Sequence, residues 1–119
     1  MEVRTSNLAD GIRKIDLKGR LDLEGANLID LQFTVLTASE RTLAIVDLAG
    51  VEFLASIGIA TLVRNAKAAR LRDGNMVLLN PQPQVARVLA VSRIDQVIPV
   101  CYDLDEALTA VRGTASRLL

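Results

Sequence analysis

Ser56 carries the side chain best placed for chemistry in this sequence. It lies in the run Ala55-Ser56-Ile57-Gly58, after an apolar stretch that ends at Leu54. From Ile59 the apolar residues recur with helical spacing, so a helix is predicted to begin at Ser56 and to end near residue 72. The first turn of a helix exposes backbone N–H groups, which a serine oxygen can cap and which also favour a bound phosphate. Position alone favours the cap, although the two roles can coexist.

Other kinds of chemistry lack their usual residues. The sequence has no histidine, which excludes a Ser-His-Asp or Cys-His nucleophile and a histidine-ligated metal site. Cys101 is the single cysteine and is interpreted as a packing residue, so no intrachain disulfide or zinc site is expected. Glycine-rich phosphate-binding loops do not occur. Lys+Arg 14 balances Asp+Glu 14, which argues against a nucleic-acid binder. We therefore expect no enzymatic activity, no cofactor and no metal.

The string DLAGVEFLASIG, residues 47–58, resembles the signature of STAS domains, which occur in bacterial anti-sigma factor antagonists. In that signature a strand ends in Asp-Leu, a short loop follows, and an Asp-Ser-Ser/Thr-Gly motif opens a helix. The resemblance implies that Ser56 is the serine that becomes phosphorylated and that Gly58 is the glycine of the motif. The sequence departs from the pattern at Ala55, where the family has aspartate, and at Ile57, where the family has a second hydroxyl residue.

A second stretch, GRLDLEGA at residues 19–26, resembles the Gly-x-Leu/Val-Asp loop of the same family. This resemblance implies that Asp22 lies beside the Ser56 loop, in a neighbourhood that contributes to partner binding. From the sequence alone, Asp22 is equally suited to cap a helix, and Phe53 and Leu54 could simply close the end of the core. The predicted partner-binding residues are Asp22, Asp47, Phe53, Leu54, Ala55, Ser56, Ile57 and Gly58.

Strands and helices alternate along the chain. The predicted strands are residues 2–8 and 12–18, joined by a turn at Ala-Asp-Gly, then 43–46, 76–79 and a last edge strand at 97–100. The predicted helices run from 22 to about 39, from 56 to about 72, from Pro83, and from Asp103 to about Gly113. The first helix is predicted to bury Leu28, Leu31, Val35 and Leu36, and the second to expose Arg64, Asn65 and Lys67. Gly50 is interpreted as a turn and Gly74 as the left-handed end of the second helix.

These elements predict a single α/β domain over residues 1–119, with a core of aliphatic side chains because aromatics make up only 3%. The STAS resemblance implies a small mixed β-sheet of about four to five strands, with about four helices mainly on one face. The chain is expected to be cytoplasmic and not to insert into a membrane, because its apolar runs are short and its first residues lack a signal-peptide pattern.

The function that the resemblance implies is partner switching. In that mechanism an anti-sigma factor, which is also a serine kinase, binds either a sigma factor or the unphosphorylated antagonist. Phosphorylation of Ser56 would end the binding, and a serine phosphatase would restore it. An alternative is a STAS subunit that is not phosphorylated and docks to the ATPase of a lipid-transporting ABC complex. A third hypothesis is a small enzyme or nucleotide-binding domain, which the missing histidines and phosphate-binding loops disfavour.

Overall fold

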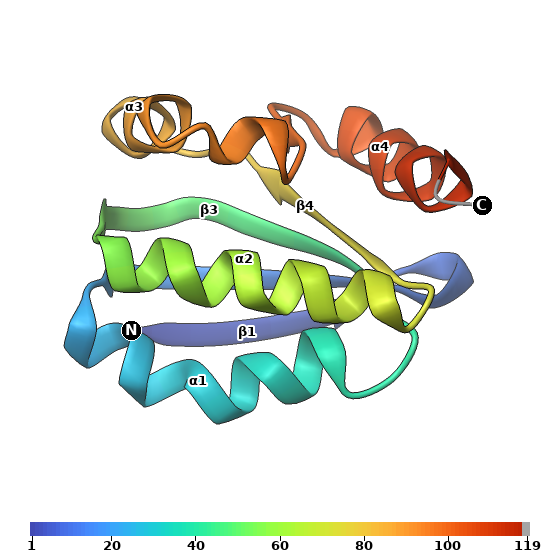
Figure 1. Cartoon of the computed structure of the whole chain (residues 1–119), viewed down its shortest axis with the longest axis horizontal. Helices are drawn as coiled ribbons and strands as arrows, with labels where there is room; N and C mark the ends of the chain where they lie inside the picture. The colour runs from blue at the N-terminus through green and yellow to red at the C-terminus, as the bar shows by residue number, and fades with distance from the viewer. Residues whose placement is uncertain (118–119) are drawn as a thin grey trace.

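A five-stranded sheet organises the molecule. The computed structural model describes residues 1–117, and within them the strands lie side by side in the order β1-β2-β3-β4-β5. The order along the chain is β1 (Glu2–Asn7), β2 (Ile12–Leu21), α1 (Leu23–Ala38), β3 (Leu43–Leu54), α2 (Ser56–Leu71), β4 (Asn75–Leu79), α3 (Pro83–Val91), β5 (Val100–Cys101) and α4 (Leu104–Arg117). Short 3-10 turns occur at Ala9–Gly11 and Ile94–Gln96. Figure 1 shows the helices arranged around the sheet.

The sheet is mixed, as predicted. Strand β1 pairs antiparallel with β2, and β2, β3, β4 and β5 are parallel to one another. The turn of the β1–β2 hairpin depends on two left-handed residues, Asp10 with φ 64° and Gly11 with φ 73°, a conformation that aspartate and glycine tolerate well. Each later strand is followed by a helix that returns the chain to the start of the next parallel strand. The α/β class and the strand count were therefore predictable.

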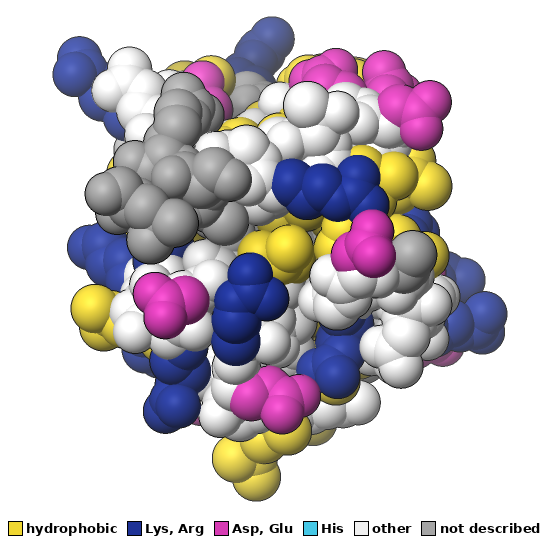
Figure 2. Space-filling model, turned by 90° about the vertical axis from the view of Figure 1, so that its right-hand side faces the viewer, with side chains coloured by type: hydrophobic (Ala, Val, Ile, Leu, Met, Phe, Trp, Pro, Cys, Tyr) yellow, Lys and Arg dark blue, Asp and Glu magenta, His cyan; other side chains and the backbone are white. Residues whose placement is uncertain are grey.

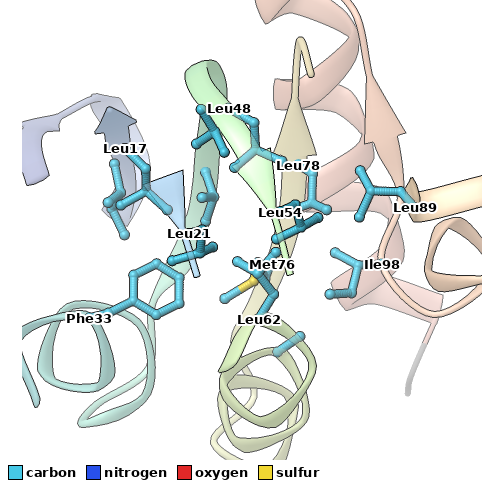
Figure 3. Close-up of a cluster of buried hydrophobic side chains, with 14 of the residues drawn as sticks. Leu17, Leu21, Phe33, Leu48, Leu54, Leu62, Met76, Leu78, Leu89 and Ile98 are labelled. Carbon is cyan, nitrogen blue, oxygen red and sulfur yellow. The ribbon is translucent and has the colours of Figure 1, made fainter. Parts of the chain in front are cut away.

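Three helices cover one face of the sheet and α4 covers the other. The larger buried cluster joins α1, α2 and α3 to the sheet through Phe33, Leu62 and Leu89, and Figure 3 shows these side chains directed toward the strand residues. The second cluster joins Ala107 and Val111 of α4 to the opposite face. Successive strand residues alternate between the clusters, because neighbouring side chains of a strand point to opposite faces. The expectation of helices mainly on one face is confirmed.

Strands β2 and β3 are longer than their apolar patterns indicated. Both continue past the predicted breaks, to Leu21 and Leu54, and they stay paired through two register shifts. Gly50 is not a turn but lies inside β3, where an added Cβ would stand 3.0 Å from the carbonyl oxygen of Leu17. Close backbone approach at an irregularity is a common reason for glycine in a strand. Residues 51–54, expected to form a loop, belong to the strand.

Helix α1 buries the opposite side from the one predicted. Leu28, Leu31 and Val35 are exposed, whereas Ile29 and Phe33 are only 2% and 0% exposed. Of the predicted residues, Leu36 alone packs against the core, where it is partly buried. The helix has apolar residues on both sides, and the side that packs on the sheet combines small residues with Ile29 and Phe33. Its buried residues are Gly25, Ala26, Ile29, Phe33, Thr37 and Ala38.

One side chain of α2 and two helix ends also differ from the predictions. Asn65 is buried rather than exposed, and its amide donates to the carbonyl oxygen of Thr61 at 2.9 Å. Asp73, not Gly74, is left-handed after α2, with φ 64°. Gly74 is instead required by packing, because a Cβ there would lie 2.3 Å from the carbonyl oxygen of Thr42. Gly113 does not end α4, which continues to Arg117.

The last strand is shorter than predicted. Strand β5 contains only Val100 and Cys101, and residue 97 lies after the 3-10 turn rather than in the sheet. Its position at the sheet edge agrees with the prediction from Pro99. Within residues 1–117, no helix combines the length and the hydropathy that a transmembrane helix requires.

Candidate partner-binding site

Ser56 is the first residue of helix α2. Ala55 occupies the N-cap position in an extended conformation (φ −93°, ψ 168°), and no side chain caps this helix. The interpretation of Ser56 as the N-cap is therefore wrong by one residue. Ser56 is exposed, and its hydroxyl forms no hydrogen bond with any residue that the structure describes. The hydroxyl is free to be modified or to contact another molecule.

The first turn of α2 presents unpaired N–H groups beside that hydroxyl. The first hydrogen bond of the helix runs from the N–H of Ile59 to the carbonyl oxygen of Ala55 at 3.1 Å. The N–H groups of the three preceding helical residues, 56–58, have no partner inside the helix. Together with the positive end of the helix dipole, they form a favourable environment for a negatively charged group at Ser56.

The end of β2 lies directly beside the start of α2. The N–H of Ala55 donates to the carbonyl oxygen of Leu21 at 3.0 Å, and Leu21 pairs with Leu54 in the sheet. The next residue is Asp22, which caps α1 by accepting a hydrogen bond from the N–H of Gly25 at 2.9 Å. Two helices therefore begin at the same edge of the sheet, as the carboxyl ends of neighbouring parallel strands dictate. The structure brings Asp22 close to the Ser56 region.

The Asp22 carboxylate is stabilised in its ionised form. The hydrogen bond from the Gly25 N–H is the main reason why the pKa of Asp22 is lowered from its ordinary value. Arg20 contributes as well, through a hydrogen bond from its Nε at 3.3 Å. The capping interpretation of Asp22 is confirmed. Near neutral pH the edge of the sheet where α2 begins therefore carries an ionised carboxylate paired with Arg20.

Each of the two helices has a glycine at its third position, and packing requires both. An added Cβ at Gly58 would lie 2.6 Å from the carbonyl oxygen of Leu21, and one at Gly25 would lie 2.0 Å from that of Arg20. Gly58 is buried, so its role is to let α2 begin directly against β2 rather than to admit a partner. The repeated spacing, a cap followed three residues later by glycine, is a sequence signal for this arrangement.

An exposed apolar and cationic surface adjoins Ser56. Phe53 and Ile57 are 41% and 39% exposed, whereas Leu54 is buried at 4% and closes the end of the core. The guanidinium of Arg20 lies over the Phe53 ring, 4.3 Å from its centroid, in the geometry of a cation–π contact. Arg20 was not among the predicted residues, because its contact with Phe53 depends on the register between β2 and β3. We call Arg20, Asp22, Phe53, Ser56 and Ile57 the Ser56 surface.

Asp47 does not belong to the Ser56 surface. It stands seven residues before Leu54 in the same strand, a separation on the order of 20 Å at the usual rise of a strand. Its carboxylate accepts from the N–H of Ala49 at 2.8 Å and pairs with Lys14 at 3.1 Å. The prediction that Asp47 shapes the surface around Ser56 is not supported by this position, because the strand continues beyond the Asp-Leu pair.

A charged hollow lies on the face of the sheet opposite α1, α2 and α3, and Lys14 and Asp47 are among the residues that line it. Its volume is about 320 Å³. Partial burial acts to lower the pKa of Lys14, but hydrogen bonds to Asp16 and Asp47 outweigh it, so the pKa is raised. The ammonium group is thus held between two carboxylates. Among the described residues, no cluster of His, Cys, Asp and Glu side chains is arranged to hold a metal ion.

Comparison with known proteins places the chain in a family. The model of the STAS domain matches residues 5–107. A Mycobacterium tuberculosis protein, described as a candidate anti-anti-sigma factor (Rv2638), is 34% identical over 71 residues, which cover 60% of this chain and 47% of that protein. The matched part thus spans about half the length of that relative.

Solved structures show the same fold. An anti-sigma factor antagonist from Mycobacterium paratuberculosis superposes with a TM-score of 0.81 at 24% identity, covering 93% of each chain. SpoIIAA of Bacillus in its unphosphorylated form superposes with a TM-score of 0.72 at 21% identity, covering 94% of this chain and 97% of that one. SpoIIAA has also been solved in its phosphorylated form. With its five-stranded sheet, its paired helix starts and its match over residues 5–107, the chain belongs to the STAS domain family.

Proposed function

We propose that this protein is an anti-sigma factor antagonist whose binding to an anti-sigma factor is controlled by phosphorylation of Ser56. One observation carries the proposal: the Ser56 hydroxyl is exposed at the start of α2, beside the partly exposed Phe53 and Ile57. The relatives described as anti-sigma factor antagonists support the general role. SpoIIAA, which has this fold, exists in phosphorylated and unphosphorylated forms. On this proposal the chain is a ligand and a kinase substrate rather than an enzyme, and it acts in the cytoplasm.

The Ser56 surface is suited to bind a partner, and a phosphate on Ser56 would block that binding. Phe53 and Ile57 provide apolar contact area, and aromatic side chains are favoured at the centre of protein interfaces. A neutral hydroxyl between them adds no charge to the interface. A phosphate would add nearly two negative charges near Asp22, whose carboxylate already pairs with Arg20. A partner surface that presents no cation at that point would oppose the added charge strongly. The unphosphorylated form is therefore the form that binds.

The alanine at position 55 is compatible with this switch. Where the family signature has aspartate, Ala55 leaves the first turn of α2 without an acceptor from a capping side chain. A phosphate on Ser56 would be the first anionic group to meet these N–H groups, so the helix start would stabilise it. Ala55 thus removes a negative charge that would otherwise compete with the phosphate.

The partners proposed here are those that the STAS resemblance implies. The anti-sigma factor would act as the serine kinase that transfers the phosphate, and a serine phosphatase would remove it. Both enzymes would act on the hydroxyl of Ser56, which is exposed.

The test compares three variants as baits in extracts of the native host. Ser56→Ala should retain an anti-sigma factor with kinase activity, and Ser56→Asp should lose it. Ser92→Asp is the matched control, because Ser92 is an exposed serine at the end of α3, away from α2, and it should bind like wild type. Equal capture of the anti-sigma factor by the Ser56→Asp and Ser56→Ala baits would refute the phosphorylation switch.

A further inference from the structure

The outward sides of α1 and α2 expose apolar residues that the core does not use. On α1, Leu28, Leu31 and Val35 are 67%, 78% and 51% exposed, and their spacing of three and four residues forms one stripe. On α2, Leu71 is 88% exposed. Figure 2 shows hydrophobic side chains projecting at the bottom of the molecule, at the level of α1. A stripe of this kind on a helix is typical of an interface with another helix.

The two helices carry opposite charges. Helix α1 contains the acidic residues Glu24 and Asp30 and no basic residue. Helix α2 exposes Arg64 and Lys67 and contains no acidic residue, whereas its third cation, Arg70, is partly buried and donates to the side chain of Asn75 at 3.2 Å. Asp30 and Arg64 form an ion pair across the seam between the helices. A surface that is apolar and acidic on one side and apolar and basic on the other is complementary to a rotated copy of itself.

We propose that this chain associates with a second copy of itself through the outward faces of α1 and α2, with α1 of each copy packed on α2 of the other. The two helices run in the same direction because each follows the carboxyl end of one of two neighbouring parallel strands (Figure 1). A two-fold axis parallel to the helices therefore places the acidic α1 of each copy against the basic α2 of the other copy, so the same contact occurs two times.

Side-chain sizes fit this arrangement. With the helix starts level, Val35 of one copy lies across from Ala68 of the other, and Leu28 lies next to Ala60. The alanines leave room for the larger side chains, as small and large residues alternate in packed helix pairs. The Asp30–Arg64 pairs of the two copies meet near the axis as four alternating charges.

Self-association would compete with partner binding. Ile57 lies on the outward side of α2 and also belongs to the Ser56 surface, so a second copy and an anti-sigma factor could not both cover it. This consequence rests on the proposed function, whereas the self-association does not. A measurement of mass without any partner therefore tests the self-association alone.

The experiment is sedimentation equilibrium of the full chain from about 1 µM to about 1 mM, a range that brackets weak to moderate association. We expect a reversible dimer that weakens as salt is added, because exposed charge pairs are screened. Leu31→Arg should raise the dimer dissociation constant by about tenfold or more, since it places a cation across from Arg64. Val91→Arg on α3 is the matched control, because Val91 is 79% exposed and lies outside these faces.

A charge exchange makes the test specific. Asp30→Arg should weaken the dimer, and the double variant with Arg64→Asp should restore it, because the exchange recreates the opposite pairing within and between copies. Circular dichroism checks that each variant is folded. A chain that stays monomeric over the whole range, or a dimer that Leu31→Arg and Val91→Arg leave equally strong, would overturn the proposal.

Discussion

Gly58 packs directly against Leu21: a side-chain carbon at Gly58 would lie 2.6 Å from the Leu21 carbonyl oxygen and 2.7 Å from its Cγ. This contact joins the first turn of α2 to the end of β2. It places Ser56 beside Asp22, although the two residues are far apart in the sequence. The geometry of the Ser56 surface therefore depends on a position that carries no functional group.

Replacing that glycine tests the contact. Gly58→Ala should lower the free energy of unfolding by about 1–3 kcal/mol, because the added carbon meets backbone that cannot move aside easily. Gly113→Ala is the matched control inside α4, where no atom among the described residues lies within 4 Å of an added Cβ. It should raise stability by about 0.5–1 kcal/mol, the usual gain from alanine over glycine in a helix. Urea denaturation measures both, and equal effects would contradict the packing argument.

The empty cap of α2 provides a second prediction. Ala55→Asp should raise the free energy of unfolding by about 1 kcal/mol, because the new carboxylate can accept from the unpaired N–H groups of the first turn. Ala55→Asn should give a similar gain, which separates capping from the charge effect. Thermal or urea denaturation at neutral pH measures both variants. A neutral or negative effect of both substitutions would show that the helix start does not accept a capping side chain.

The spacing of apolar residues predicted the element types well, because in most elements the apolar residues of the pattern are also the residues that are buried. The β3 and β4 strands were recognised from runs that are apolar at every position, and both are buried between helices on the two faces. Helix α1 was the exception, since Leu31 and Phe33 mark two different apolar sides. When both sides of a helix are apolar, the sequence alone does not indicate which side will pack against the sheet.

The site was predicted in part. Ser56 was placed at the start of a helix correctly, but the cap is Ala55, which has no side-chain oxygen and so gave no signal. Asp47 was misplaced because Gly50 normally marks a turn, and only the pairing with β2 keeps β3 extended through it. Arg20 was missed because its contact with Phe53 joins two strands, and such a neighbour is visible only once their register is known.

The cap of α1 makes stability depend on pH. The pKa of Asp22 is lowered in the folded state, mainly by the Gly25 N–H. The ionised carboxylate therefore stabilises the fold above the unfolded value of 3.8, and this stabilisation is lost as the pH falls below it. Asp22→Asn keeps a capping oxygen without the charge. The stability difference between wild type and Asp22→Asn should be largest near neutral pH and should shrink in acid; a difference that stays constant between neutral pH and pH 3 would contradict the assignment.

The buried thiol offers a measure of how often the edge strand β5 opens. Cys101 is 2% exposed, and burial is the main cause that raises its pKa to about 11, with Glu106 adding to the effect. At mildly alkaline pH the folded protein holds almost no thiolate, which is the reactive form. A thiol reagent should therefore modify Cys101 only as fast as the edge strand β5 opens, and the rate should rise steeply with urea. Gly58→Ala, which destabilises the distant α2–β2 contact, should accelerate labelling if β5 opens only with the whole domain. Labelling of the native protein as fast as that of a free thiol would contradict the buried position.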